Sequence, residues 1–265
     1  MKLHHVLTAT YLLVFCPEVL ATSNILKALY VDDFEAKTLD SSITYFKLNG
    51  EVGFLTSSGN TDTASAKIAL DSEHELRAWS NRYRLETLYR ESSANGRPRE
   101  VSAQRFYSSG EFDFKLSNPD QRLFFFAEYD NNRFGSYDYQ LAIAAGWAHR
   151  AVVRDKHNIR YSIGPGYGVA VRKDGEQDRQ NQGFILRASI EYQHQLNSGA
   201  QLRQFVSAEA NEFATRSRSE TSLSTQIMES LAMKLSFILD YNSGVDKLNK
   251  SVDTETSIAL VYQFF

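Results

Sequence analysis

The chain ends in the segment Ser257-Ile258-Ala259-Leu260-Val261-Tyr262-Gln263-Phe264-Phe265, in which large apolar side chains alternate with other residues. Successive side chains of a strand point to opposite faces of a sheet. One face is therefore formed by Ile258, Leu260, Tyr262 and Phe264, so that it finishes in two aromatic residues. This alternation predicts a terminal strand whose two faces meet different surroundings.

The same period of two recurs along most of the chain. Its clearest example runs from Phe184 to Gln193, where Leu186 belongs to the apolar face and Arg187 to the opposite one. Pro is scarce, and Tyr and Phe are abundant, which also favours strands. The sequence therefore predicts an all-β fold. Twelve strands are expected near residues 44–56, 62–73, 77–92, 101–116, 121–132, 137–150, 157–173, 181–196, 200–214, 219–228, 232–243 and 252–264.

The connections between these strands alternate in length, which favours a membrane barrel. Short turn-forming sequences at 117–120, 155–156 and 197–199 alternate with longer polar connections at 94–99, 174–180 and 243–250. Several strands exceed the roughly 9 to 11 residues that a tilted strand needs to cross hydrocarbon. We therefore expect a transmembrane antiparallel β-barrel of about 12 strands over residues 43–265, with both ends on the periplasmic side. Alternation alone leaves a soluble β-sandwich open.

The N-terminus has the three parts of a secretory signal peptide. Lys2 precedes an apolar run from Val6 to Phe15, and small residues lead up to Ala21. The apolar run is too short to span a bilayer as a helix. We expect cleavage after Ala21, which removes the only cysteine, Cys16. Lipidation of Cys16 is the alternative, but the bulky Phe15 fits that processing site poorly.

Residues 22–42 are then expected to form a periplasmic N-terminal extension or a short plug before the barrel domain. The chain has 29 Lys and Arg residues against 32 Asp and Glu residues, so no charge excess points to nucleic acid. No stretch after the signal is apolar for long enough to form a membrane-spanning helix. We expect a monomer in the lipid bilayer of the cell outer membrane.

The last strand resembles the recognition strand by which the barrel assembly machinery captures outer-membrane proteins. The residues that carry this resemblance are Ser257, Ala259, Tyr262 and Phe264. An aromatic strand offers backbone groups to a sheet edge and side chains to a groove, which is the chemistry of strand addition. The chain departs from the pattern in two places: Ala259 stands where glycine is usual, and Phe265 follows the final aromatic position.

A family resemblance rests on longer stretches. They are Gly50-Glu51-Val52-Gly53-Phe54, Ser57-Ser58-Gly59-Asn60-Thr61-Asp62-Thr63, Arg160 with Gly164-Pro165-Gly166-Tyr167-Gly168, and the closing Ala259-Leu260-Val261-Tyr262-Gln263-Phe264. Together they are similar to the salt-induced outer-membrane protein family (YdiY-like), a domain family of unknown function, over about Gly50 to Phe265. The resemblance implies an outer-membrane barrel and no particular activity. The glycines at 164, 166 and 168 are expected to leave room inside the barrel for long side chains.

The face opposite the apolar one carries charges of both signs. These charges suit either a polar lumen in which arginines select solutes, or a network of ion pairs that fills a narrow barrel. We favour the filled interior. The residues expected in the lumen are Lys67, Arg82, Arg84, Glu86, Arg90, Arg105, Glu111, Asp113, Arg122, Glu128, Asp130, Arg160, Arg172, Arg187, Glu191, Arg203, Glu209, Lys234 and Asp240.

No motif identifies a catalytic, cofactor or metal site. His74, His149, His157 and His194 lie singly near predicted strand ends, without the HExxH pattern or another metal-ligand spacing. The function expected is an outer-membrane barrel with a structural or envelope-stress role, or a narrow channel. Two alternatives remain open: an outer-membrane enzyme that modifies lipid, which would need a serine and a histidine on adjacent strands, and a soluble periplasmic β protein.

A deletion tests the expected assembly signal. Removing Phe264 and Phe265 together should leave exported protein unassembled in the periplasm, because the last strand must be recognised before the barrel closes. Protease accessibility of the exported protein measures this. Removing Phe265 alone is the control and should have a mild effect, since Tyr262 and Phe264 keep their spacing. Normal membrane insertion after loss of both residues would show that this end is not the signal.

Overall fold

The computed structural model describes residues 44–57, 61–94, 98–118, 120–134, 137–154, 156–172, 180–212, 214–244 and 251–264. The expected signal peptide (1–21), the N-terminal extension (22–42), Phe265 and residues 58–60 of the Ser-Gly-Asn-Thr stretch lie outside the described residues. Within the described ranges, no helix is long and apolar enough to cross a membrane.

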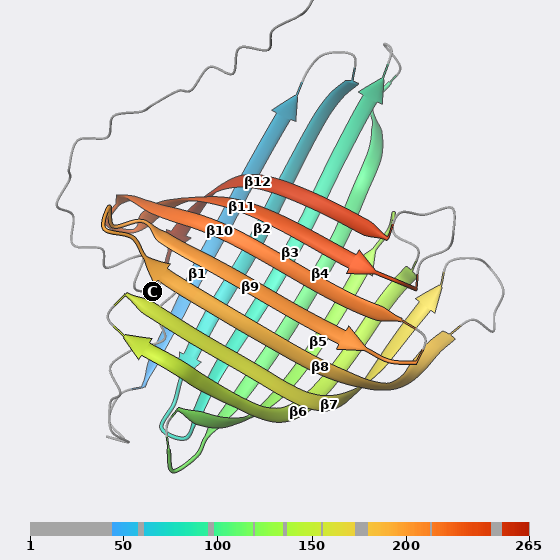
Figure 1. Ribbon diagram of the computed structural model, residues 1–265. Coiled ribbons are helices and arrows are strands. Elements are labelled where there is room, and N and C mark those ends of the chain that lie inside the picture. The colour runs from blue at the N-terminus through green and yellow to red at the C-terminus, as the bar shows by residue number, and fades with distance from the viewer. Residues whose placement is uncertain are drawn as a thin grey trace, which may run out of the picture.

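The described strands form one closed antiparallel barrel (Figure 1). Each strand pairs with its neighbours in the chain, and the first strand pairs with the last. The predicted fold class is confirmed. The twelve strands are β1 (Tyr45–Ser57), β2 (Thr61–Glu75), β3 (Trp79–Ala94), β4 (Glu100–Lys115), β5 (Gln121–Asn132), β6 (Tyr137–Arg154), β7 (His157–Arg172), β8 (Gln180–Gln195), β9 (Gln201–Ala210), β10 (Thr215–Met228), β11 (Leu231–Asn242) and β12 (Val252–Gln263).

The burial of side chains is the reverse of that in a soluble protein. On β8, Leu186 is 53% exposed while its neighbour Arg187 is 5% exposed. Apolar residues of the other strands are likewise exposed on the outside, and many charged residues are buried inside. A soluble β-sandwich hides its apolar faces between two sheets. An apolar outside around a polar inside is instead the arrangement of a transmembrane barrel.

The start of β1, the end of β12 and the connections that follow the even-numbered strands lie at one end of the barrel, which we call the terminus end. The opposite end, which has the connections that follow the odd-numbered strands, is the far end. The turn between β8 and β9 shows how the short connections are made: the amide of Leu196 donates to the carbonyl of Ala200 at 2.8 Å. Gly199 supplies the left-handed backbone conformation, with φ of 81°. The predicted turn at 197–199 therefore forms.

The boundary between β9 and β10 differs from the prediction. The ninth strand was expected to reach residue 214 and the tenth to begin at 219, whereas β9 ends at Ala210 and β10 begins at Thr215. The segment Thr215-Arg216-Ser217-Arg218 alternates between hydroxyl and arginine side chains. The segment contains no apolar residue, so its sequence lacks the alternation of apolar and polar residues that marks a strand. Its backbone nevertheless pairs with β9 and β11.

Glycines let β6 and β7 approach each other closely. A Cβ atom on Gly164 would lie 2.2 Å from the carbonyl oxygen of Ala145, and one on Gly146 would lie 2.3 Å from that of Ile163. Both strands curve strongly in Figure 1. The expectation that the glycines of β7 make room for side chains from facing strands is therefore wrong for Gly164. That position needs a bare backbone because the neighbouring strand occupies the space.

A substitution on the outer face tests the orientation of β8. Leu186→Arg places a charge on the exposed apolar surface and should destabilise the inserted barrel by about 2 to 4 kcal/mol if the residue lies near the bilayer midplane. Folding titrations into lipid vesicles measure this free energy. Leu186→Met, which keeps an apolar side chain, is the control. Equal stability of the two variants would contradict the assigned orientation.

Candidate functional site

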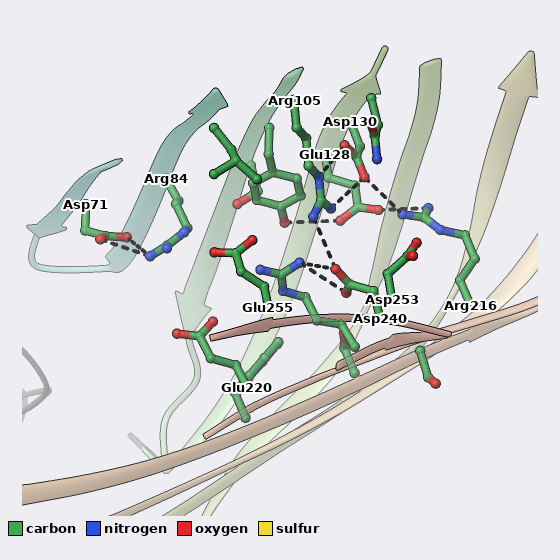
Figure 2. A pocket seen from close by; sticks show the side chains of 18 of the residues that line it. Asp71, Arg84, Arg105, Glu128, Asp130, Arg216, Glu220, Asp240, Asp253 and Glu255 are labelled. Carbon is green, nitrogen blue, oxygen red and sulfur yellow. Dashed lines mark hydrogen bonds and ion pairs between the residues drawn. The ribbon is translucent and has the colours of Figure 1, made fainter. Parts of the chain in front are cut away.

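The interior of the barrel holds a cavity of about 610 Å³. Charged side chains from both walls line it, and Figure 2 shows several of them meeting in pairs. Most of the charges expected in the lumen are among the lining residues. These are Arg82, Arg84, Arg90, Arg105, Glu111, Glu128, Asp130, Arg160, Arg187, Glu191, Arg203, Glu209, Lys234 and Asp240.

Two arginines expected in the lumen lie away from the cavity lining. Arg122 is 4% exposed, and its Nη1 lies 3.5 Å from a carboxylate oxygen of Asp113. Arg172 lies at the far end of β7, where its guanidinium donates to the carbonyl of Gly244 at 3.4 Å and sits over the ring of Tyr137. Arg172 therefore holds the far-end connection of β11 to β12 against β6 and β7.

One group of charges joins β4 to strands that are not its neighbours. Arg160 on β7 donates through Nη2 to carboxylates of both Glu111 and Asp113 on β4, and the Asp113 contact is 2.7 Å. Arg82 on β3 also bonds Glu111 at 2.6 Å, and its Nη1 lies 3.7 Å from Glu191 on β8. Because β3 and β8 are far apart around the barrel, these side chains connect opposite walls.

A second connection between walls lies farther along the cavity (Figure 2). Arg105 on β4 makes a two-pronged contact with Asp130 on β5, with Nε at 2.9 Å and Nη2 at 2.8 Å from the two carboxylate oxygens. Its remaining Nη1 reaches Asp240 on β11 at 3.2 Å. Asp240 also accepts from Arg218 on β10 at 2.9 Å. Planar guanidinium groups are suited to such multiple carboxylate contacts.

A third connection joins β10 and β8 to β5. Arg216 on β10 lies 3.1 Å from Glu128 on β5 and 3.3 Å from Glu209 on β9. Arg187 on β8 donates to Glu209 and places its guanidinium carbon 3.6 Å from the centre of the Phe126 ring. A cation over an aromatic face gains electrostatic attraction, more so when both are shielded from water.

Two lysines connect β1 and β2 with β11 and β12. Lys67 on β2 donates to Glu255 on β12 at 2.8 Å and lies 3.3 Å from Glu86. Lys234 on β11 donates to Glu51 on β1 at 2.9 Å. Both ion pairs therefore bridge across the junction where the first strand meets the last.

Part of the interior is filled by apolar groups. Phe124 and Phe126 of β5 point inward and form a buried cluster with Ala144 and Ala148 of β6. The run Leu123-Phe124-Phe125-Phe126 is apolar at every position, so its period does not reveal which rings face inward. The rings reduce the open space on the β5 side of the lumen.

Several interior charges were not identified from the sequence. Arg216 and Arg218 were missed because the tenth strand was expected to begin after them. The others lie inside predicted strands and alternate with residues that are exposed outside, a signal that would have found them. The missed residues that line the cavity are Glu51, Asp71, Glu73, Arg216, Arg218, Glu220, Asp253 and Glu255.

The paired arrangement limits what the interior can do. Burying a charge without a partner is costly, and breaking a buried ion pair leaves such a charge behind. Connections between walls occur at several places along the lumen, and each consists of groups of opposite sign. The charges of the lumen are therefore engaged largely with one another across its width.

The histidines are less isolated than expected. His157 and His194 are register partners on β7 and β8, and their rings stack with centroids 4.3 Å apart. His149 stacks on Trp147 and contacts Tyr161. The expectation that the histidines lie singly is therefore wrong for His157 and His194, which contact each other. Among the described residues, no group of three or more His, Cys, Asp or Glu side chains could hold a metal ion.

The expected assembly residues lie on both faces of the last strand. Ser257 and Ala259 face inward, while Tyr262 and Phe264 are exposed outside with ring centroids 5.1 Å apart. The amide of Phe264 donates to the carbonyl of Leu48 on β1 at 2.9 Å. A Cβ atom on Gly50 would lie 2.7 Å from the Phe264 ring, so this glycine makes space for the aromatic side chain.

Solved structures with similar chain arrangements are membrane proteins of low sequence identity. The COG4313 outer membrane channel from Pseudomonas putida F1 is 10% identical, with 89% of this chain and 99% of that chain covered and a TM-score of 0.47. The NanC porin is 10% identical, with 82% and 100% covered and a TM-score of 0.48. The translocator domain of the autotransporter NalP from Neisseria meningitidis is 9% identical, with 85% and 91% covered and a TM-score of 0.46.

These identities carry no information on what this chain binds. A search of curated proteins gives no match. The family model described as "Protein of unknown function, DUF481" matches residues 50–264, which is most of the chain and almost all of the barrel. The match agrees with the resemblance that the sequence motifs indicate. The chain therefore belongs to the DUF481 family of proteins of unknown function.

Proposed function

We propose that this protein is an outer-membrane barrel with a structural role in the cell envelope, and that its interior is at most a narrow passage closed at rest. The observation that carries the proposal is the set of ion pairs that join opposite walls. Arg105 with Asp240 and Arg216 with Glu128 are the most direct examples. A role in envelope stress or in the response to salt follows only from the family resemblance.

The width that follows from the number of strands does not decide whether the lumen is open. Barrels of eight strands are filled by side chains, and those of sixteen leave an aqueous channel, so twelve strands fall between these cases. Here aromatic rings on one side and paired charges between the walls narrow the interior around a cavity of about 610 Å³. The lumen holds charges of both signs close together. A charged solute therefore meets attraction and repulsion at the same position, which gives little preference for anions or cations.

The route to the membrane is part of the proposal. We infer that residues 1–21 direct export, that 22–42 remain in the periplasm, and that the barrel assembly machinery inserts a monomer. The aromatic end of β12, with Tyr262 and Phe264 exposed, supports recognition by that machinery. The far end of the barrel then faces the outside of the cell.

Conductance in planar bilayers tests the closed interior. The unmodified protein should give small or no openings, with weak ion preference. The double variant Arg105→Gln, Asp240→Asn removes a connection between opposite walls and should raise conductance several-fold. The control is Arg84→Gln, Asp71→Asn, which removes a pair between adjacent strands at 2.8 Å and should leave conductance low.

Large, stable and strongly anion-selective openings of the unmodified protein would overturn the proposal. They would make the interior arginines a selectivity filter. Equal conductance of the two double variants would show that pairs across the lumen have no special part in closing it.

A further inference from the structure

The junction between β1 and β12 is paired over a shorter length than any other in the described barrel. Its register contains five pairs, from Asn49 with Gln263 to Gly53 with Ala259. The other pairs of neighbouring strands in the described ranges each have ten or more. All five pairs lie toward the terminus end, so the hydrogen bonds between β1 and β12 are confined to that part of the junction.

Toward the far end, both strands continue without pairing to each other. On β12, residues Val252–Ile258 pair with β11 but have no partner on β1 among the described residues. On β1, residues Phe54–Ser57 pair only with β2. Figure 1 shows the two strands diverging from their paired ends. The barrel therefore has a gap in its hydrogen-bond ladder beyond Gly53, which we call the seam.

The seam lies at the depth of the apolar outer surface. Thr256 has no register partner on β1 among the described residues, and on its other side it pairs with Phe237 of β11. Phe237 is 47% exposed on the outside. A backbone N–H or C=O group that faces hydrocarbon without a hydrogen-bond partner costs several kcal/mol of free energy. This edge of β12 is therefore the place where the wall of the barrel opens most readily.

The charged cavity supplies access to that edge from inside. Asp253, Thr254 and Glu255 of β12 all line the cavity. Lys67 crosses behind β1 to reach Glu255, and the same lysine lies 3.3 Å from Glu86. Glu86 also pairs with Arg84 at 2.7 Å. Two cations, Lys67 and Arg84, therefore stand against three carboxylates, those of Glu86, Glu255 and, two residues away on β12, Asp253. The charge at the inner side of the seam is therefore negative on balance.

We propose that the seam is a lateral portal that binds an amphiphile with a cationic amine head group and an apolar tail. The head group enters the cavity and takes the place of the Lys67 ammonium at Glu255, with Asp253 as a second acceptor. The tail leaves between Phe54, which is 70% exposed, and Ile258, which is 53% exposed. A ligand in the seam would contact hydrocarbon on the lipid side and carboxylates on the cavity side, so an amphiphile fits it best. The portal is independent of ion flow along the barrel axis.

Photoaffinity labelling of the folded protein in phospholipid nanodiscs tests this portal. The probe is a dodecylammonium amphiphile with a diazirine on its tail, and the matched probe is the corresponding dodecyl sulfate. Labelled positions are mapped by mass spectrometry of peptides. The ammonium probe should label residues 54–57 and 252–258 at least several-fold more than the rest of the outer surface. The sulfate probe should show no such preference.

Variants locate the head group. The double variant Asp253→Asn, Glu255→Gln should reduce labelling of the seam by the ammonium probe about tenfold, which corresponds to about 1.4 kcal/mol of binding free energy. Glu75→Gln, at the terminus end of β2, where the carboxylate pairs with Lys115, is the control and should leave labelling unchanged. Even labelling around the barrel, equal labelling by both probes, or an unaltered pattern in the double variant would each overturn the proposal. None of these outcomes depends on conductance.

Discussion

The constraint on which the structure depends is that backbone hydrogen bonds must be completed within the sheet wherever it meets hydrocarbon. A closed barrel meets this requirement because no strand is left with a free edge. Closure fixes the rest: alternate side chains must face lipid or the interior, and the apolar side chains go outside. The exposed Leu186 beside the buried Arg187 shows this separation within two residues. The seam between β1 and β12 is the place where the constraint is not fully met.

Closure also brings charges together that are remote in the sequence. Polar residues that cannot face lipid are confined to one interior, where an unpaired charge would be costly. Arginines dominate the pairs between walls, and their planar groups bond more than one carboxylate, as Arg105 does with Asp130 and Asp240. Lys67 and Lys234 instead sit where β1 meets β12. The network therefore both fills the lumen and holds the first strand to the last.

The strands could be predicted from the sequence because outer residues are apolar and inner ones are not. Prediction failed where that contrast is missing. The start of β10 has only hydroxyl and arginine side chains, and β5 has apolar residues on both faces, so Arg216, Arg218 and the inward Phe126 were not recognised. The pairing of charges could not be predicted, because it depends on the tilt and stagger of the strands in the closed barrel. The stacked pair His157 and His194 was missed because it depends on the register between β7 and β8.

The central claim is that charges on opposite walls interact directly. A double-mutant cycle on Arg216 and Glu128, which lie 3.1 Å apart on β10 and β5, tests it most directly. Unfolding free energies of the unmodified protein, Arg216→Gln, Glu128→Gln and the double variant would be measured in lipid vesicles. The account predicts a favourable coupling energy of about 0.5 to 3 kcal/mol, as for residues in one ion-pair network. A coupling energy of zero, with the two single effects adding, would contradict it.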